Sequence, residues 1–274
     1  MTPVDTSEKG TAAQDGSIDR AELKAEIIKK RGYWHPFHEG LLQWDPAYLR
    51  AYLNFHDAPW KSGHLELKVR EFIYIAVDGA VSHLYDTGLR KHMVGALKAG
   101  ASQEELLQVI QITTAIAHNT HELAMPMLVA ELKKTRPGIE EEIANLNAEE
   151  KRKKDDFIAA TGYWPECGDA MLKFAPSFVE GFLGYRERAW NSGPLEAKIK
   201  EFISLAVCAS PSLLYKDGVR FHIGRALKYG ATPEEISDVL QLASAIAIHT
   251  CTHSVPALID ALAEVSKEAT MAVR

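Results

Sequence analysis

The sequence has few cysteines and no long hydrophobic run, and each shortage argues against a class of protein. Its 274 residues include three cysteines, Cys167, Cys208 and Cys251, which are an odd number and lie far apart. This pattern argues against a disulfide framework and against a four-cysteine zinc site. No apolar run reaches the roughly eighteen residues of a membrane span, and the polar start lacks the apolar core of a signal peptide. We therefore expect a cytoplasmic protein with reduced thiols and no membrane partner.

A basic block is also missing. The chain has 31 lysines and arginines against 37 aspartates and glutamates, a formal net charge of −6, and its basic residues are not clustered. Nucleic acid is therefore not an expected partner. The content of 46% hydrophobic and 25% charged residues is that of an ordinary globular protein, long enough to bury a sizeable core.

What the sequence does contain is a duplication. The octapeptide YDTGLRKH at 85–92 returns as YKDGVRFH at 215–222, which is 130 positions later. In this gapless register about 39 of 101 positions are identical between residues 32–132 and 162–262, a period far longer than that of a solenoid. We expect a disordered tail over 1–18, a first repeat over 19–135, a linker helix over 136–155 and a second repeat over 156–274.

Each repeat has the pattern of a helical domain. Between residues 69 and 80 the apolar side chains recur at the three- and four-residue spacing of a buried helix face. Pro126 and Pro256 are expected to kink or end the last helix of each repeat. Strand signals are weak throughout, so the sequence predicts an all-α fold.

Capping signals mark where one helix of each repeat begins. Ser102 with Glu105, and Thr232 with Glu235, match the capping box, in which two side chains satisfy the first backbone N–H groups of a helix. Pro233 suits the first helical position. The same helix start is therefore predicted in both repeats.

The order of these features resembles the carboxymuconolactone decarboxylase family, which includes the alkylhydroperoxidase AhpD-like proteins. A histidine-bearing helix is followed by GASQEEL at 100–106 or GATPEEI at 230–236, and then by an alanine-rich helix. The resemblance covers roughly residues 60–132 and 190–262. It implies a tandem duplication of an AhpD-like helical domain with N-terminal helical extensions, and a homotrimer that forms a pseudo-hexamer.

The octapeptide separates this chain from the redox members that it resembles. Those members place Cys-x-x-Cys before the histidine, at the positions that Tyr85 and Gly88 occupy in one repeat and Tyr215 and Gly218 in the other. Without paired thiols there is no dithiol/disulfide cycle. The resemblance therefore implies a family member that is not a thiol peroxidase.

Without redox thiols, acid–base catalysis is the chemistry that the recurring residues could perform. The family has a glutamate nineteen residues before the histidine, and the nearest equivalents here lie twenty-one before it, which indicates a loop longer by two residues. Such a carboxylate would fix the imidazole tautomer and make the histidine a general acid or base, and a tyrosine could donate a hydrogen bond to an enolate oxygen. There are competing, purely structural interpretations. The histidines could be core residues whose hydrogen bonds are made within the protein, the glutamates could be solvated surface residues, and the tyrosines could serve only in packing. The catalytic candidates are His92, Glu71, Tyr85, His222, Glu201 and Tyr215.

The repeats differ most after the alanine-rich turn. One has His118 and His121, the other His249 and His253, and helical spacing puts each pair on one face. We predict that they line the substrate pocket; packing and chelation are alternatives. Metal is not expected, because the order of HNTHE matches no zinc-helix motif, and the candidates if one bound are His92, His118 and His121. The first repeat holds most of the histidines and is the expected site if only one repeat works.

The resemblance implies a lyase that removes CO2 from a small carboxylated lactone or ring-cleavage acid in aromatic compound catabolism. Loss of CO2 leaves a carbanion that a lactone carbonyl delocalises, so no cofactor is required, and there is no glycine-rich nucleotide loop. Hydrolysis or isomerisation of the same substrate class is one alternative, with or without a metal. A non-catalytic helical oligomer that binds a small molecule or another protein is the other.

Overall fold

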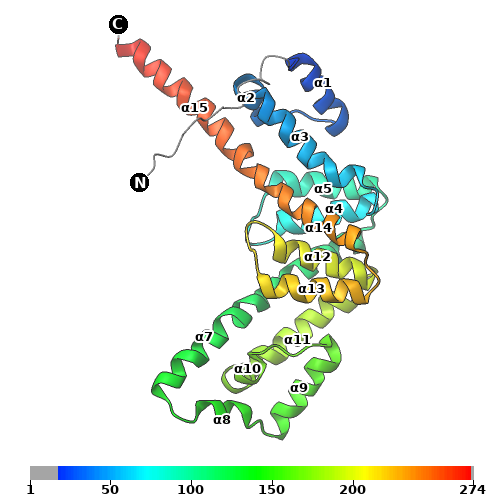
Figure 1. The fold of residues 1–274 in the computed structure, drawn as a ribbon, viewed down its shortest axis with the longest axis vertical. Helices are drawn as coiled ribbons and strands as arrows, with labels where there is room; N and C mark the ends of the chain where they lie inside the picture. The colour runs from blue at the N-terminus through cyan, green and yellow to red at the C-terminus, as the bar shows by residue number, and fades with distance from the viewer. Residues whose placement is uncertain (1–17, 273–274) are drawn as a thin grey trace, which may run out of the picture. The chain divides into compact units, whose positions relative to one another are not determined.

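The computed structural model describes residues 18–272, and every regular element in this range is a helix (Figure 1). The all-α prediction is confirmed. Residues 1–17 of the predicted tail lie outside the described residues. The described residues form two compact units: a terminal unit of residues 18–62 and 247–272, and a central unit of residues 63–246.

The terminal unit joins the first helices of the chain to the last one. Its core is a cluster of buried side chains that includes Leu23, Ile27, Leu49 and Leu53. The side chain of Asp19 accepts hydrogen bonds from two backbone N–H groups and begins the first helix. The helices are α1 (Arg20–Arg31), α2 (Pro36–Trp44), α3 (Pro46–Lys61) and α15 (His249–Ala272).

The central unit holds both octapeptides. Its helices are α4 (Leu67–Gly79), α5 (Asp86–Lys98), α6 (Gln103–Thr113), α7 (Asn119–Thr135), α8 (Ile139–Ala144), α9 (Ala148–Thr161), α10 (Gly168–Phe174), α11 (Pro176–Asn191), α12 (Ala197–Ala209), α13 (Lys216–Lys228) and α14 (Pro233–Ser244). One core cluster contains Phe72 and Val109 from the first repeat and Ile203 and Val207 from the second. Burial of these side chains stabilises both repeats together, by about 1.5–3 kcal/mol for each large side chain.

The compact units cut across the predicted repeat boundaries, because side chains of both repeats fill one core. The predicted linker over 136–155 contains α8 and the start of α9, which are separate helices. The side chain of Asn147 accepts from the backbone N–H of Glu150 at 2.9 Å and begins α9. The repeat boundaries themselves stay a prediction.

The helix starts predicted from the capping signals are confirmed. Ser102 Oγ accepts from the backbone N–H of Glu105 at 3.1 Å, and Glu105 accepts from the backbone N–H of Ser102 at 2.8 Å. Thr232 and Glu235 form the same reciprocal pair at 3.2 and 2.8 Å. These caps fix where α6 and α14 begin.

The prediction that the prolines end these helices is wrong, and the alternative of a kink stays a prediction. The chain stays helical through Pro126 in α7 and through Pro256 in α15. The break comes earlier instead, at short 3₁₀ segments over Thr114–His118 and Ala245–Ile248. A proline removes one hydrogen bond to the carbonyl four residues before it, and a long helix with many other bonds tolerates that loss.

By length and composition, one helical stretch, Pro233–Met271, could cross a membrane. Its first part is α14, whose Val239, Leu242 and Ala243 are buried in the protein core. Core helices of soluble proteins pass the same test, so the stretch is weak evidence for a membrane span.

Candidate functional site around His222

The loop that leads into each octapeptide has the same unusual backbone. Leu84 and Leu214 have φ values of 50° and 49°, in the left-handed region that non-glycine residues rarely adopt. The tyrosine that follows each leucine bonds back to the end of the preceding helix. The backbone N–H of Tyr85 donates to the carbonyl of Asp78, and that of Tyr215 to the carbonyl of Cys208, each at 2.8 Å. The loop therefore closes each helix end tightly and starts the histidine-bearing helix beside it.

In the second repeat this arrangement brings Glu201 of α12 against His222 of α13. The Nδ1 atom of His222 lies 2.7 Å from Oε2 of Glu201. The carboxylate of Glu201 is fully buried, whereas the histidine side chain keeps 16% of its exposure. A buried acceptor of this kind fixes the tautomer in which Nδ1 carries hydrogen. The spacing of twenty-one residues therefore still allows the two side chains to meet.

The first repeat has the same pair with different surroundings. Nδ1 of His92 lies 2.7 Å from Oε2 of Glu71. The ring of Tyr74 stacks on the imidazole with ring centres 4.4 Å apart. On the other side, Nε2 of His92 lies 4.0 Å from Oδ2 of Asp78. Burial raises the pKa of Asp78 to about 7.

Two substitutions between the repeats change what surrounds the glutamate. At a register of 130, Asp78 corresponds to Cys208 and Gly95 to Arg225. The Nε–H of Arg225 donates to Oε1 of Glu201, and another guanidinium N–H donates to the hydroxyl of Tyr229 at 2.9 Å. Glu201 thus has both a histidine and an arginine as partners.

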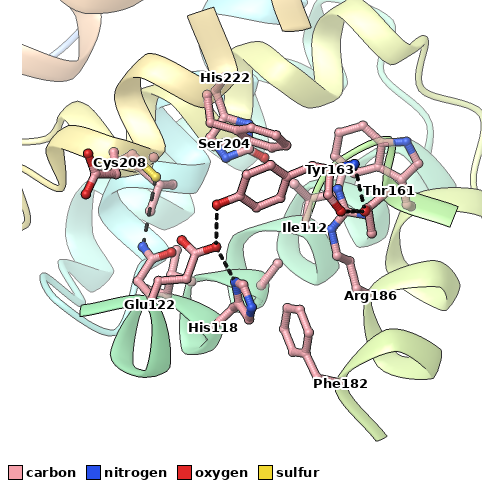
Figure 2. A pocket seen from close by; sticks show the side chains of 18 of the residues that line it. Ile112, His118, Glu122, Thr161, Tyr163, Phe182, Arg186, Ser204, Cys208 and His222 are labelled. Carbon is pink, nitrogen blue, oxygen red and sulfur yellow. Dashed lines mark hydrogen bonds and ion pairs between the residues drawn. The ribbon is translucent and has the colours of Figure 1, made fainter. Parts of the chain in front are cut away.

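His222 lines a partly enclosed cavity of about 80 Å³ within the central unit (Figure 2). Both repeats contribute to it: α7 from the first, and α9, α11, α12 and α13 around the second. The side chains that surround the cavity include the aromatic residues Phe157, Tyr163, Phe182, Trp190 and Phe221 and the polar residues His118, Glu122, Arg186, Cys208 and Asp217. A small, mostly apolar cavity with a few convergent polar groups is the usual form of a ligand site.

Glu122 of α7 is the centre of the hydrogen bonds in this cavity. It accepts from the hydroxyls of Tyr215 and Tyr163 at 2.7 and 3.3 Å, and its Oε1 lies 3.2 Å from Nδ1 of His118. Burial opposes ionisation, but the hydrogen bonds outweigh it and hold the pKa of Glu122 below its usual range. Burial and the bond to this carboxylate raise the pKa of Tyr215. The hydroxyl of Tyr215 is thus committed to Glu122.

Glu122→Gln should therefore alter the pH dependence of stability. Because the folded-state pKa lies below the value of 4.5 for a free glutamate, ionised Glu122 stabilises the fold above pH 4.5, and that contribution is lost as pH falls through the folded-state pKa. We expect the free energy of unfolding of the variant to fall less steeply between about pH 5 and pH 3 than that of the wild type. Urea titrations at several pH values test this, and equal slopes would contradict it.

His118 and Glu122 form a second imidazole–carboxylate pair at the same cavity. The imidazole of His118 stacks on Phe182 with ring centres 4.5 Å apart. Its Nε2 atom is buried and has no hydrogen-bond partner among the described residues. A buried polar atom without a partner costs about 1–3 kcal/mol, a cost that a ligand group would remove. The cavity is thus lined by two histidines, each paired with a glutamate.

The other predicted histidines lie elsewhere. His121 stacks on Phe178 with ring centres 3.9 Å apart and does not line the cavity. His249 and His253 lie on α15, and His253 is exposed. No metal was expected, and in the described part of the chain the fallback candidates His92, His118 and His121 do not come within ligand distance of one another. His118 and His121 instead stack on two different phenylalanines of α11, Phe182 and Phe178.

The cysteine and glycine near the octapeptide have structural explanations. Burial raises the pKa of Cys208 to about 12, so its thiol stays protonated and unreactive. A Cβ atom at Gly218 would lie 2.7 Å from the sulfur of Cys208, and one at Gly88 would lie 2.1 Å from Oδ2 of Asp78. The recurring glycine is therefore needed because two helices approach closely at this point.

Sequence reasoning missed Tyr163 and Arg186, which line the cavity, and Arg225, which bonds to Glu201 beside His222. Tyr163 belongs to the recurring GYW tripeptide, which could have marked it. The two arginines correspond to His56 and Gly95 in the first repeat, so comparing the repeats does not reveal them. The packing of α11 brings Arg186 to the cavity, and that of α13 brings Arg225 to Glu201.

Known proteins similar to this chain agree with the fold and the duplication. The model of the carboxymuconolactone decarboxylase family matches residues 46–125 and again 176–266. A solved protein from Burkholderia xenovorans LB400, provisionally named a gamma-carboxymuconolactone decarboxylase subunit, superposes with a TM-score of 0.83 and 32% identity over 90% of this chain and 99% of its own. An uncharacterised protein of Cupriavidus necator (strain H16) is 32% identical over 73 residues, which are 27% of this chain and 63% of that relative's length.

Proposed function

Because the chain belongs to the carboxymuconolactone decarboxylase family, we propose that the cavity around His222 is the active site of a lyase acting on a small carboxylated lactone or ring-cleavage acid. One observation carries the proposal: the buried carboxylate of Glu201 lies 2.7 Å from His222, which lines a partly enclosed cavity. An imidazole fixed in this way is suited to donate or accept a proton at a bound ligand.

The proposed reaction uses this geometry. When the carbon–carbon bond to the carboxylate breaks, its electron pair stays on the substrate as a carbanion that an adjacent carbonyl delocalises, and CO2 leaves. With Nδ1–H of His222 donating to Glu201, the protonated Nε2 is the atom that faces the substrate. It transfers its proton to the carbanion carbon, and the imidazole recovers a proton from water. The carboxylate of Glu201 stabilises the imidazolium that waits for substrate.

His118 is the residue that supports the enolate oxygen in this proposal. Its Nδ1 is paired with Glu122, and its buried Nε2, which must also carry hydrogen to donate to the enolate oxygen, is the atom left for a ligand. Tyr215 acts indirectly, since its hydroxyl donates to Glu122 and not to the cavity. His222 is thus the acid, Glu201 its positioning residue, and His118 the oxyanion partner.

Isomerisation of the same substrate class is the second candidate. Two imidazole–carboxylate pairs, Glu201 with His222 and Glu122 with His118, line one cavity. A pair of this kind could remove a proton from one carbon while the other returns a proton elsewhere. This route needs no loss of CO2.

Mass spectrometry separates these candidates. A panel of carboxylated lactones and ring-cleavage acids is incubated with the purified protein. Loss of CO2 supports the lyase, gain of water points to hydrolysis, and a new isomer of unchanged mass supports isomerisation. If no compound changes while the protein is folded, the lyase proposal fails for this substrate class and the binding-protein alternative gains support.

The remaining expectations stay proposals. The family resemblance supports a homotrimer and a role in aromatic compound catabolism in the cytoplasm. The acid–base route above uses side chains alone, so we propose that it needs no metal or organic cofactor. Size-exclusion chromatography with light scattering would measure the assembly.

A further inference from the structure

Arg186 of α11 brings a positive charge to the cavity without a partner for it. Its guanidinium group lines the cavity and lies 5.2 Å from the ring centre of Trp190. No hydrogen bond or ion pair of Arg186 is found with any described residue. Burial and the neighbouring Arg225 lower the pKa of Arg186, although both glutamates of the cavity act in the opposite direction.

The two carboxylates whose charges act on Arg186, those of Glu201 and Glu122, already have other partners. Glu201 bonds to His222 and Arg225, and Glu122 bonds to two tyrosines and lies against His118. Arg225 in turn donates to Glu201, to the backbone carbonyl of Thr161 and to Tyr229. Of these two arginines, only Arg186 has guanidinium N–H groups available to donate to a ligand. A planar guanidinium held beside an aromatic ring matches a carboxylate in geometry and charge.

The other end of the cavity leads toward apolar surface. In Figure 2 Arg186 and Cys208 lie on opposite sides of the cavity, and Asn119 lies close to the sulfur of Cys208. Ile116, Asn119 and Asp217 line both this cavity and an apolar groove of about 850 Å³. The groove continues over Leu89, Met93 and Ile110.

We propose that Arg186 binds the carboxylate of an organic acid whose apolar body extends past His222 toward this groove. The inference rests on the proposed function and narrows its substrate class to acids with an apolar ring or chain. The positive charge of Arg186 favours a carboxylate at one end of the ligand. The residues shared by the cavity and the groove favour an apolar group at the other end. The carboxylate at Arg186 is not the group that leaves as CO2, so a lyase substrate would carry a second carboxylate, and the half-buried guanidinium would keep its partner throughout.

Calorimetric titration of the full chain with acetate, benzoate and trans-cinnamate tests the proposal without turnover. Arg186→Gln is expected to weaken the binding of every acid that the wild type binds, by about 10- to 100-fold. Arg188→Gln is the matched control, because Arg188 is exposed on the same helix and does not line the cavity. Ile110→Glu, at a side chain 42% exposed, should weaken trans-cinnamate more than acetate.

The outcomes are distinct from those of the activity test. Binding that Arg186→Gln leaves unchanged, or no binding of any of the three acids, overturns the inference even if the protein releases CO2 from another compound. Binding that depends on Arg186 with no turnover supports the inference and counts against the lyase. If Ile110→Glu changes the oligomeric state and leaves binding intact, the groove is a contact between copies of the chain and the apolar part of the inference fails.

Discussion

His222→Ala is expected to lower kcat for CO2 release by about 10²- to 10⁴-fold, the range typical of a lost general acid or base. The physical reason is that no other group in the cavity combines an imidazole with the buried pair of Glu201 and Arg225. The rate is measured by mass spectrometry on the compound that the wild type converts. Circular dichroism of the variant checks that the helices remain.

The same change in the first repeat, His92→Ala, is the matched control and should lower kcat by less than about 10-fold. The reason lies in the register of the duplication. The positions equivalent to His118, Glu122 and Arg186 are Ile248, Thr252 and His56. The first repeat therefore does not repeat the residues that complete the cavity around His222. This expectation reverses the one from histidine content, which favoured the first repeat.

Equal losses in the two variants would show that both repeats act, and an unaffected His222→Ala would remove the proposed acid. Glu201→Gln adds a readout that a packing role would not change. Removing the negative charge beside His222 should lower kcat more than it changes KM, because the charge is needed when the imidazole transfers its proton.

The sequence was sufficient for everything that depends on local pattern. The duplication, the helical class and the two capping boxes follow from spacing alone, because helix periodicity and capping act over a few residues. The pairs Glu71–His92 and Glu201–His222 were candidates for the same reason, since a family spacing indicated them. Whether they serve catalysis is untested.

The sequence was insufficient where helices distant along the chain meet. His118 and Glu122 belong to the first repeat, yet they line the cavity of His222 in the second. No pattern within one repeat could show this, because it depends on a core shared by α4, α6 and α12. The pairing of Tyr215 with Glu122, 93 residues apart, has the same origin and moves that hydroxyl away from the role first expected for it.

Arg225→Met is the change from which we expect the largest loss of stability, about 3 kcal/mol. Glu201 is fully buried, and Arg225, with 15% of its side chain exposed, is one of its two partners. Methionine keeps much of the apolar packing but removes the cation, so the carboxylate is left buried with only His222 beside it. Truncating one partner of a buried pair costs more than the pair itself contributes, because the remaining charge cannot return to water. Urea denaturation of the variant and the wild type measures the free energy of unfolding.

Two further variants show whether the charge is responsible. Arg188→Met removes an exposed arginine and should change the free energy of unfolding by no more than about 0.5 kcal/mol. Glu201→Met with Arg225→Met removes both members of the pair, and its stability should recover most of the loss, because no unpaired charge remains. Should the double variant be as unstable as Arg225→Met alone, the loss would come from packing and from the bond of Arg225 to the Thr161 carbonyl, which ties α13 to the end of α9. The same double variant should be inactive whatever its stability, since His222 has then lost the carboxylate that holds it toward the cavity.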